Sequence, residues 1–387
     1  MKNDYGRPEQ GHSFEHHNFY DSLVNMGHDI LYFDFMTHLQ QHGKGWMNRR
    51  LLEVVRSEKP TLVFTILFTD EIEKKTVRAI SESGETTTLN WFCDDHWRFD
   101  SYSRDWAPCF NRVVTTAESA RAKYDMLGYT NVIKSQWACN HFQYRRLNLP
   151  LIYDVTFVGQ PHGTRRAVIE SIRQAGIDVR AWGNGWEGGR VSQEEMIRIF
   201  NQSRINLNLS NASVNPAGAA PGTGRIIKEA VNRALGSVPG GAVARKAGKG
   251  LLTATRRLRS VAGDGGNDCL QPVTGEADQI KGRNFEVPGC GGFLLTGRAD
   301  NLDDYYVMEK EIGFFEDMKD LVGRIRFYLD NEEARAAVAE AGYRRTLQEH
   351  TYAHRFSEIF EEMGLPHPSL EAVLSGSIGP GRTLEIQ

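Results

Sequence analysis

Short apolar runs alternate with segments of helical periodicity in the first part of the chain. The apolar runs predict strands at 30–35, 61–67, 86–92, 111–116 and 131–133. The periodic segments predict helices at 13–26, 48–56, 70–81 and 117–127. The run 61–67 has almost no polar alternation, which is typical of a strand buried on both faces of a parallel sheet. The pattern therefore predicts an α/β domain, to which we assign residues 1–149.

The same alternation starts again after Pro150, a residue typical of a linker. Further strands are predicted at 154–158, 177–182, 205–210 and 293–295, and near 315. Helices are predicted for about ten residues after Arg166 and at 193–200, 318–329 and 332–349, and a last one runs from an N-cap at Thr351 to Met363. We assign residues 150–365 to a second α/β domain and residues 366–387 to a flexible tail.

Residues 215–275 interrupt this pattern. They are rich in Gly, Ala and Pro, and their basic residues face almost no acids before Asp264. The apolar residues between them permit two short amphipathic helices. The change of composition predicts that the segment is an insertion. A basic amphipathic insertion can contact an anionic membrane surface, and we assign that contact to residues 225–260. The alternative is a partly disordered loop, which is the interpretation we favour.

The charge and cysteine content exclude several classes of protein. The net charge of −3 gives no signature of a nucleic-acid-binding protein. No run of eighteen apolar residues predicts a transmembrane helix, and the polar start lacks the apolar core of a secretory signal. The five cysteines are scattered and form no CxxC pair, which argues against disulfides and a zinc site. These features predict a cytoplasmic protein without a metal site, peripheral to the membrane if the insertion contacts it.

Polar residues follow the predicted strand 86–92 at its carboxyl end, the place where open α/β sheets bind ligands. Asp95 and His96 at this point predict a general base or an acceptor site. The alternative is a helix N-cap beside a histidine with structural hydrogen bonds. His16, in the predicted first helix, is a further candidate for the site, although paired histidines on a helix are more often surface residues.

Two loops of the second domain carry glycines at strand ends. Gly159 and Arg165 lie between the first strand and first helix of the domain, the usual anion-binding position. Gly183 and Asn184 follow the next strand. The first loop is neither a GxGxxG fingerprint nor a P-loop, so the motif by itself is weak.

The segment QIKGRNFEVPGCGGFLLT, at 279–296, carries the most informative chemistry. Lys281 and Arg283 supply positive charge, and Glu286 is a single acid in an apolar turn that leads to a glycine cluster and a strand. Cations and one carboxylate at such a junction fit a ligand with phosphate and ribose groups. The alternative is a helix C-cap with surface Lys and Arg side chains.

The stretches KGRNFEVPGCGGFLLT, KEIGFFEDMKDLVGRIRFYL and AGYRRTLQEHTYAHRF resemble the C-terminal half of the CgeB-like glycosyltransferases, which are similar to the group 1 enzymes. GHSFEHHNFYDSLVNMGHDI and NWFCDDHWRF resemble the first half of that family. The resemblance implies a GT-B fold, in which two Rossmann-like domains face each other and a helical C-terminus follows. It places a nucleotide-sugar donor on the second domain and the acceptor on the first.

The resemblance also assigns roles to individual residues. Glu286 takes the place of the second glutamate of the group 1 E-x7-E motif, whereas the first place holds Asp278. Lys281 and Arg283 bind the donor diphosphate, so the leaving group is stabilised without a metal, and no cofactor is needed beyond the donor substrate. Unlike its relatives, the chain shows no strand ahead of the first glycine-containing loop. Either the sheet lacks its first strand or the start is truncated.

These features together predict a glycosyltransferase that acts on a glycan, a lipid-linked acceptor or a protein. Donor binding is assigned to Gly159, Arg165, Gly183, Asn184, Lys281, Arg283 and Glu286. Asp95, His96 or His16 is the base if the reaction inverts configuration. The changed acid at 278 and the missing strand leave open a catalytically silent GT-B protein that binds a glycan or a partner. A GT-B epimerase or phosphorylase is a further alternative.

Overall fold

The computed structural model describes residues 1–210 and 279–386. The predicted insertion at 215–275, its membrane-contact segment 225–260 and Asp278 therefore lie outside the described residues. In the part of the chain that is described, no helix combines the length and the apolar character that crossing a membrane requires.

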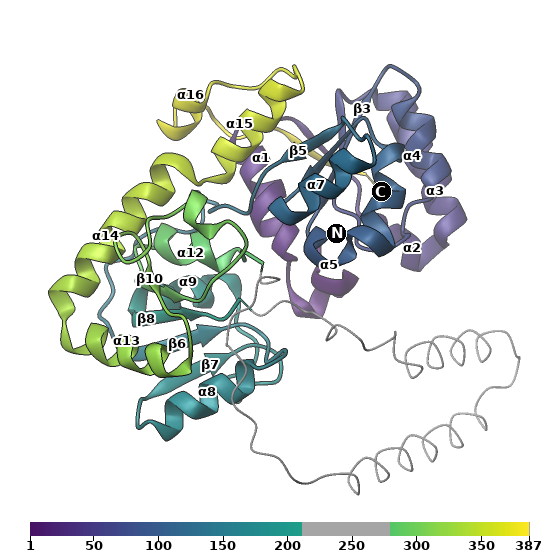
Figure 1. Cartoon of the computed structure of the whole chain (residues 1–387). Helices are drawn as coiled ribbons and strands as arrows, with labels where there is room; N and C mark the ends of the chain where they lie inside the picture. The colour runs from purple at the N-terminus through teal and green to yellow at the C-terminus, as the bar shows by residue number, and fades with distance from the viewer. Residues whose placement is uncertain (211–278, 387) are drawn as a thin grey trace, which may run out of the picture. The chain divides into compact units, whose positions relative to one another are not determined.

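The first sheet has four parallel strands in the order β2-β3-β4-β5. They are β2 (Leu62–Thr65), β3 (Thr87–Phe92), β4 (Arg112–Thr115) and β5 (Val132–Lys134) (Figure 1). β3 and β4 are almost wholly buried, because helices cover both faces of a parallel sheet. Each of these strands coincides with a predicted one.

Helices, single turns and the short strand β1 precede this sheet, and further helices and turns connect its strands. Ahead of the sheet lie η1 (Asp4–Gly6), η2 (Pro8–Gln10), the π-helical turn η3 (His16–Tyr20), α1 (Asp21–Asn25), β1 (Ile30–Tyr32), α2 (Phe35–His42) and α3 (Lys44–Glu58). Between the strands lie α4 (Lys74–Ser81), α5 (Asp95–Arg98), η4 (Phe99–Ser103), α6 (Arg104–Trp106), η5 (Ala107–Cys109) and α7 (Glu118–Met126). Helix α2 is absent from the sequence prediction, which extended the first strand to residue 35.

The second sheet has five parallel strands in the order β10-β9-β8-β6-β7. They are β6 (Tyr153–Val158), β7 (Val179–Trp182), β8 (Ser203–Asn208), β9 (Leu294–Thr296) and β10 (Gly313–Phe314). The helices are α8 (Arg165–Gln174), α9 (Gln193–Gln202), α12 (Arg283–Gly289), the turn η6 (Leu302–Asp304), α13 (Met318–Asp330), α14 (Glu332–Glu349) and α15 (Tyr352–Glu362). Thr351 caps α15 through a capping box with His354, which confirms the predicted start of this helix.

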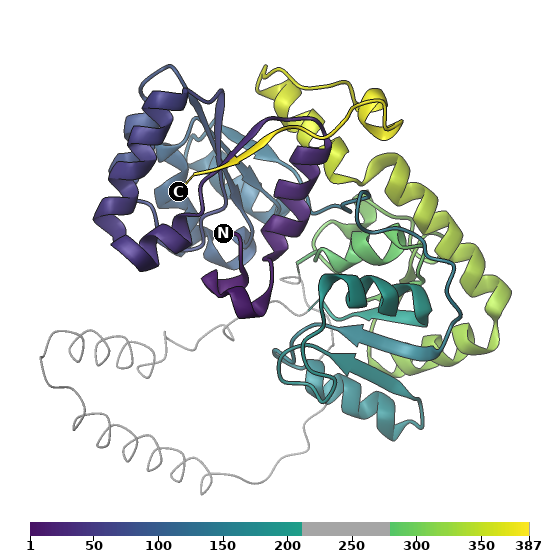
Figure 2. The same ribbon diagram turned by 180° about the vertical axis from the view of Figure 1, so that it is seen from behind.

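Residues 366–386 contain a helix and a paired strand, and the prediction of a flexible tail from residue 366 is wrong for this range. Residues 370–374 form α16 (Leu370–Leu374), and β11 (Thr383–Glu385) pairs in parallel with β1 (Figure 2). The Ile30 N–H donates to the Arg382 carbonyl oxygen at 2.7 Å, and the Gly381 N–H donates to the Val24 carbonyl oxygen at 2.8 Å. The tail is held because it satisfies backbone groups of β1.

Candidate functional site

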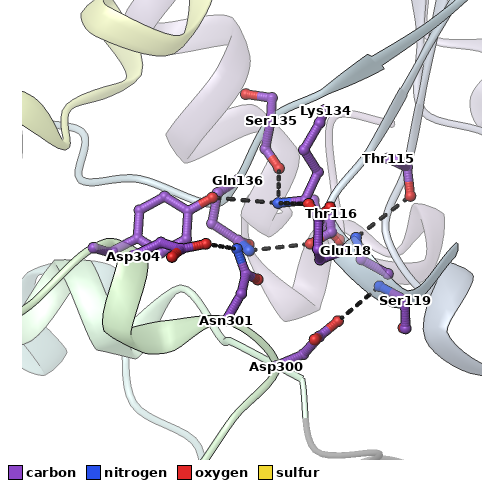
Figure 3. Close-up of polar contacts among 12 residues, drawn as sticks. Thr115, Thr116, Glu118, Ser119, Lys134, Ser135, Gln136, Asp300, Asn301 and Asp304 are labelled. Atoms are coloured by element: carbon purple, nitrogen blue, oxygen red, sulfur yellow. Dashed lines mark hydrogen bonds and ion pairs between the residues drawn. The ribbon is translucent and has the colours of Figure 1, made fainter. Parts of the chain in front are cut away.

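The carboxyl ends of strands from the two sheets meet through polar contacts (Figure 3). The Ser119 N–H, in the first turn of α7 after β4, donates to the Asp300 carboxylate at 3.3 Å. The Lys134 ammonium, at the end of β5, donates to the Tyr305 hydroxyl at 3.3 Å. Asp300 and Tyr305 belong to the segment that follows β9. Ligands of open α/β sheets bind at strand carboxyl ends, so this junction is where a site is expected.

Gln279 contacts the loops that follow β3 and β4 at the same edge. Its amide nitrogen donates to the Cys93 carbonyl oxygen, and it lies 3.3 Å from the Thr116 hydroxyl. A Cβ atom on Gly282 would lie 3.1 Å from the ring of Phe14. The loop after β3 and the N-terminal segment near residue 14 therefore both contact the segment ahead of α12, which carries Lys281.

His96 is the predicted catalytic residue that the structure places near Lys281. Burial, and then the positive charge of Lys281, lower the pKa of His96 to about 3. His96 is therefore a neutral imidazole within the electrostatic reach of Lys281, and both of its ring nitrogens are buried without a hydrogen-bond partner among the described residues.

Asp95 and His16 lie in different surroundings. The Asp95 side chain is buried and accepts a hydrogen bond from the Tyr124 hydroxyl at 2.9 Å, and burial raises its pKa. This contact fastens α5 to α7. His16 stacks on Tyr20 with ring centroids 4.4 Å apart, and it lines a cavity beside β1 and β2 whose walls do not include residues 93–96. Burial, then the neighbouring His12 and His17, lowers the pKa of His16 to about 3. The structure thus brings only His96 of the three to the predicted donor residues.

The glycine loops of the second sheet are packed against each other. The Gly159 N–H donates to the Trp182 carbonyl oxygen at 2.8 Å, and the Gly159 carbonyl oxygen accepts from the Trp186 indole N–H at 2.7 Å. A Cβ atom on Gly183, whose φ is +135°, would lie 2.3 Å from the Gly159 carbonyl oxygen. Position 183 therefore requires glycine. Asn184 next to it is exposed.

Arg165 and Arg283 reach the same strand ends. The Arg165 guanidinium donates to the Leu209 carbonyl oxygen at 2.9 Å and to the Gln160 carbonyl oxygen at 3.1 Å. The Arg283 Nε lies 3.4 Å from the Val158 carbonyl oxygen at the end of β6. Two arginines and the glycine loops therefore surround the carboxyl ends of β6, β7 and β8.

Glu286 faces the interior of the protein. Its side chain is fully buried, forms an ion pair with Arg283 and accepts a hydrogen bond from the Tyr144 hydroxyl at 2.8 Å. Burial, then Glu286, raises the pKa of Tyr144. In this arrangement the carboxylate holds Arg283 in place. Tyr144 is not among the residues predicted from the sequence, because its segment carries no periodic or glycine signal.

A buried hydrogen-bond network of amide side chains supports the segment that carries Lys281. The Asn208 amide nitrogen donates to the Asn284 side-chain oxygen at 2.9 Å and to the Thr296 hydroxyl at 3.1 Å. The Asn284 oxygen also accepts from the Lys281 N–H at 3.0 Å. The network joins the ends of β8 and β9 to the residue that carries the ammonium group. The strict polar alternation of the strand 205–210 contained a signal for Asn208, but only the fold identifies its partners.

Comparison with known proteins agrees with this architecture. Residues 164–225 and 248–361 match the family model described as "Glycosyl transferase-like". Two solved structures of Anabaena HepE, one in complex with UDP and glucose and one with UDP-glucose, are similar to this chain. Each is 10% identical in sequence, covers 85% of this chain and 88% of the HepE chain, and has a TM-score of 0.51. A comparison with curated protein sequences found no match. The chain adopts the GT-B fold, with two Rossmann-like sheets, each built of parallel strands, and a helical C-terminus.

Proposed function

We propose that this protein is a glycosyltransferase that moves a sugar from a nucleotide-sugar donor to a glycan, a lipid-linked acceptor or a protein. The observation that carries the proposal is that Lys281 lies near His96 and Gln279 contacts the loop after β3, while Arg283 of the same segment reaches the carboxyl end of β6. The match to the glycosyltransferase-like family model and the UDP and UDP-glucose held by HepE support it. Membership of the CgeB-like group is part of the proposal.

The donor diphosphate is bound by charge and by backbone amides. Gly159 leads toward the N-terminus of α8, where the positive end of the helix dipole favours an anion, and Arg165 adds charge. Lys281 and Arg283 stabilise the negative charge that develops on the leaving diphosphate, so we propose a reaction independent of metal. Glu286 and Tyr144 act as positioning residues for Arg283.

His96 is the base in this proposal if the reaction inverts configuration. A neutral imidazole can accept a proton from an acceptor hydroxyl, but a pKa near 3 makes it a weak base. A bound diphosphate beside Lys281 would offset the field of that ammonium group and raise the pKa of His96. The donor would thereby make the base stronger when it is needed.

The alternative is a catalytically silent protein that binds a glycan or a partner. Glu286, whose counterpart in group 1 enzymes belongs to the E-x7-E motif, is fully buried and paired here, which is the observation that favours this alternative.

Cytoplasmic localisation and membrane contact through residues 225–260 are also part of the proposal.

A panel of UDP-, GDP- and dTDP-sugars tests the function by calorimetry and by product analysis, with and without EDTA. Lys281→Ala should weaken binding of the preferred donor about tenfold or more, because a charge-assisted contact is lost. Arg326→Ala is the matched control, since Arg326 donates to the Ala175 carbonyl oxygen beyond the far end of α8. His96→Asn should lower kcat by about 10²-fold or more at unchanged donor affinity.

Two results would contradict the proposal. Binding of a nucleotide-sugar without hydrolysis or transfer to any acceptor supports the silent alternative. If no nucleotide-sugar in the panel binds, the proposed donor site is ruled out.

A further inference from the structure

A cavity of about 640 Å³ lies between β1 and β2. Its size falls within the range of pockets that hold small molecules, and it far exceeds the volume of a single water, about 30 Å³. Leu31 of β1 and Leu62 and Phe64 of β2 are among the lining residues. The cavity thus lies between two strand edges.

β2 presents an unpaired edge to this cavity. Within the described ranges it pairs only with β3. The Thr87 N–H donates to the Thr61 carbonyl oxygen at 3.1 Å. In a parallel ladder, alternate residues direct both backbone groups to the same neighbour, so Thr61, Val63 and Thr65 face β3. The backbone groups of Leu62 and Phe64 therefore face the cavity.

β1 has the complementary geometry on the other side. Ile30 donates to the Arg382 carbonyl oxygen, and the Tyr32 carbonyl oxygen accepts from the Ile386 N–H at 3.0 Å. Ile30 and Tyr32 thus use their backbone groups on the β11 side. The backbone N–H and C=O of Leu31 point away from β11, and Leu31 lines the cavity.

Apolar layers close the cavity on two faces. Leu51 and Val55 of α3 line it and belong to the same hydrophobic cluster as Val63. Phe19 and Leu23 line it from the other face and belong to the cluster that contains Leu62 and Phe64. A strand placed between these layers would bury both of its faces, which is the environment of a continuously apolar strand in a parallel sheet.

We propose that this cavity is a slot for an added β-strand, filled by an extended segment of about five consecutive apolar residues from a polypeptide partner. Such a segment spans about 17 Å and would hydrogen-bond to Leu31 on one side and to Leu62 and Phe64 on the other. A fatty acid or other apolar small molecule would fill the volume but leave these backbone groups without partners, which is unfavourable in a buried place.

The probe is a seven-residue peptide of five Val and Ile residues between two Lys residues, acetylated and amidated, added to the full-length protein. Hydrogen exchange should slow at least tenfold at the amides of Leu31, Leu62 and Phe64, and the thermal midpoint should rise. The matched peptide carries Pro in place of the central residue, which removes a backbone donor and should abolish both effects. The same strand, engineered ahead of Met1 because Met1 lines the cavity, should protect these amides more strongly through its high effective concentration.

Leu62→Pro provides the variant test. It removes an N–H that faces the cavity and leaves the bonds between β2 and β3 intact, so the protein should fold but lose peptide binding. If this variant does not fold, the exchange measurement on the unaltered chain still decides. Equal binding of the Pro-containing peptide, unchanged exchange at the three amides, or binding of lauric acid without any peptide binding would each overturn the proposal.

Discussion

Arg283 and Glu286 show how one residue pair links the stability of the fold to its chemistry. The Glu286 carboxylate is fully buried, whereas a quarter of the Arg283 side chain is exposed at the strand ends. Burial acts to lower the pKa of Arg283, but Glu286 and Tyr144 outweigh it and the net shift is upward. The arginine is therefore charged at all physiological pH values and ready to contact an anion.

Arg283→Ala should destabilise the protein as well as weaken donor binding. It leaves the buried Glu286 carboxylate without its cation, which costs about 3 kcal/mol or more in the free energy of unfolding. The double variant Arg283→Ala with Glu286→Gln should recover most of that loss, because no buried charge remains. Urea unfolding of both variants and of Glu286→Gln gives the coupling energy. Additive losses would show that the two side chains do not act as a pair.

At the level of elements, the pairing of β11 with β1 depends on a close backbone approach. A Cβ atom on Gly381 would lie 2.0 Å from the His28 carbonyl oxygen, so any larger residue must displace the backbone. Gly379, two residues earlier, has no atom within 4 Å of its Cβ position. These two glycines form a matched pair for testing the tail.

Gly381→Ala should lower the free energy of unfolding by about 1–3 kcal/mol, as expected for overpacking. The Ile30 amide, which donates to Arg382, should exchange faster in this variant, because β11 can no longer close on β1. Hydrogen exchange and urea unfolding measure both effects. Gly379→Ala should leave both nearly unchanged, and equal effects of the two substitutions would contradict this account.

Element types were largely predictable, whereas element partners were not. The continuous apolar run at 61–67 predicts a strand, and β2 lies within it. The last helix was recognised by Thr351, because a cap is a local signal. By contrast, β11 pairs with a strand more than 350 residues earlier in the chain, and its sequence carries no periodicity that reveals the partner. The burial of Glu286 depends in the same way on Tyr144, which lies 142 residues away.

At the scale of the molecule, α15 packs on the core of the first sheet. Phe356 is fully buried, with its ring centroid 5.9 Å from Phe19, 5.8 Å from Phe64 and 6.3 Å from Trp91. These residues share one hydrophobic cluster with Phe285 and Leu294 of the second half of the chain. The two halves should therefore unfold together.

Phe356→Ala should lower the free energy of unfolding by about 3–5 kcal/mol, because it opens a cavity in this shared cluster. The loss should appear in one cooperative transition, seen by both circular dichroism and tryptophan fluorescence. Phe327→Ala in α13 is the control, since Phe327 is 48% exposed and its loss should cost less than about 1 kcal/mol. Separate transitions for the two halves in the unaltered protein would contradict the prediction.

Local sequence accounts for the strands, the helices, the capped start of α15 and the cationic segment at 281–283, because periodicity, capping and charge act over a few residues. Contacts between distant segments account for the rest. They bring His96 beside Lys281, bury Asp95 and Glu286, and order the tail on β1. The slot between β1 and β2 also depends on contacts between distant segments. An unpaired strand edge exists only once the surrounding strands and helices have been placed around it.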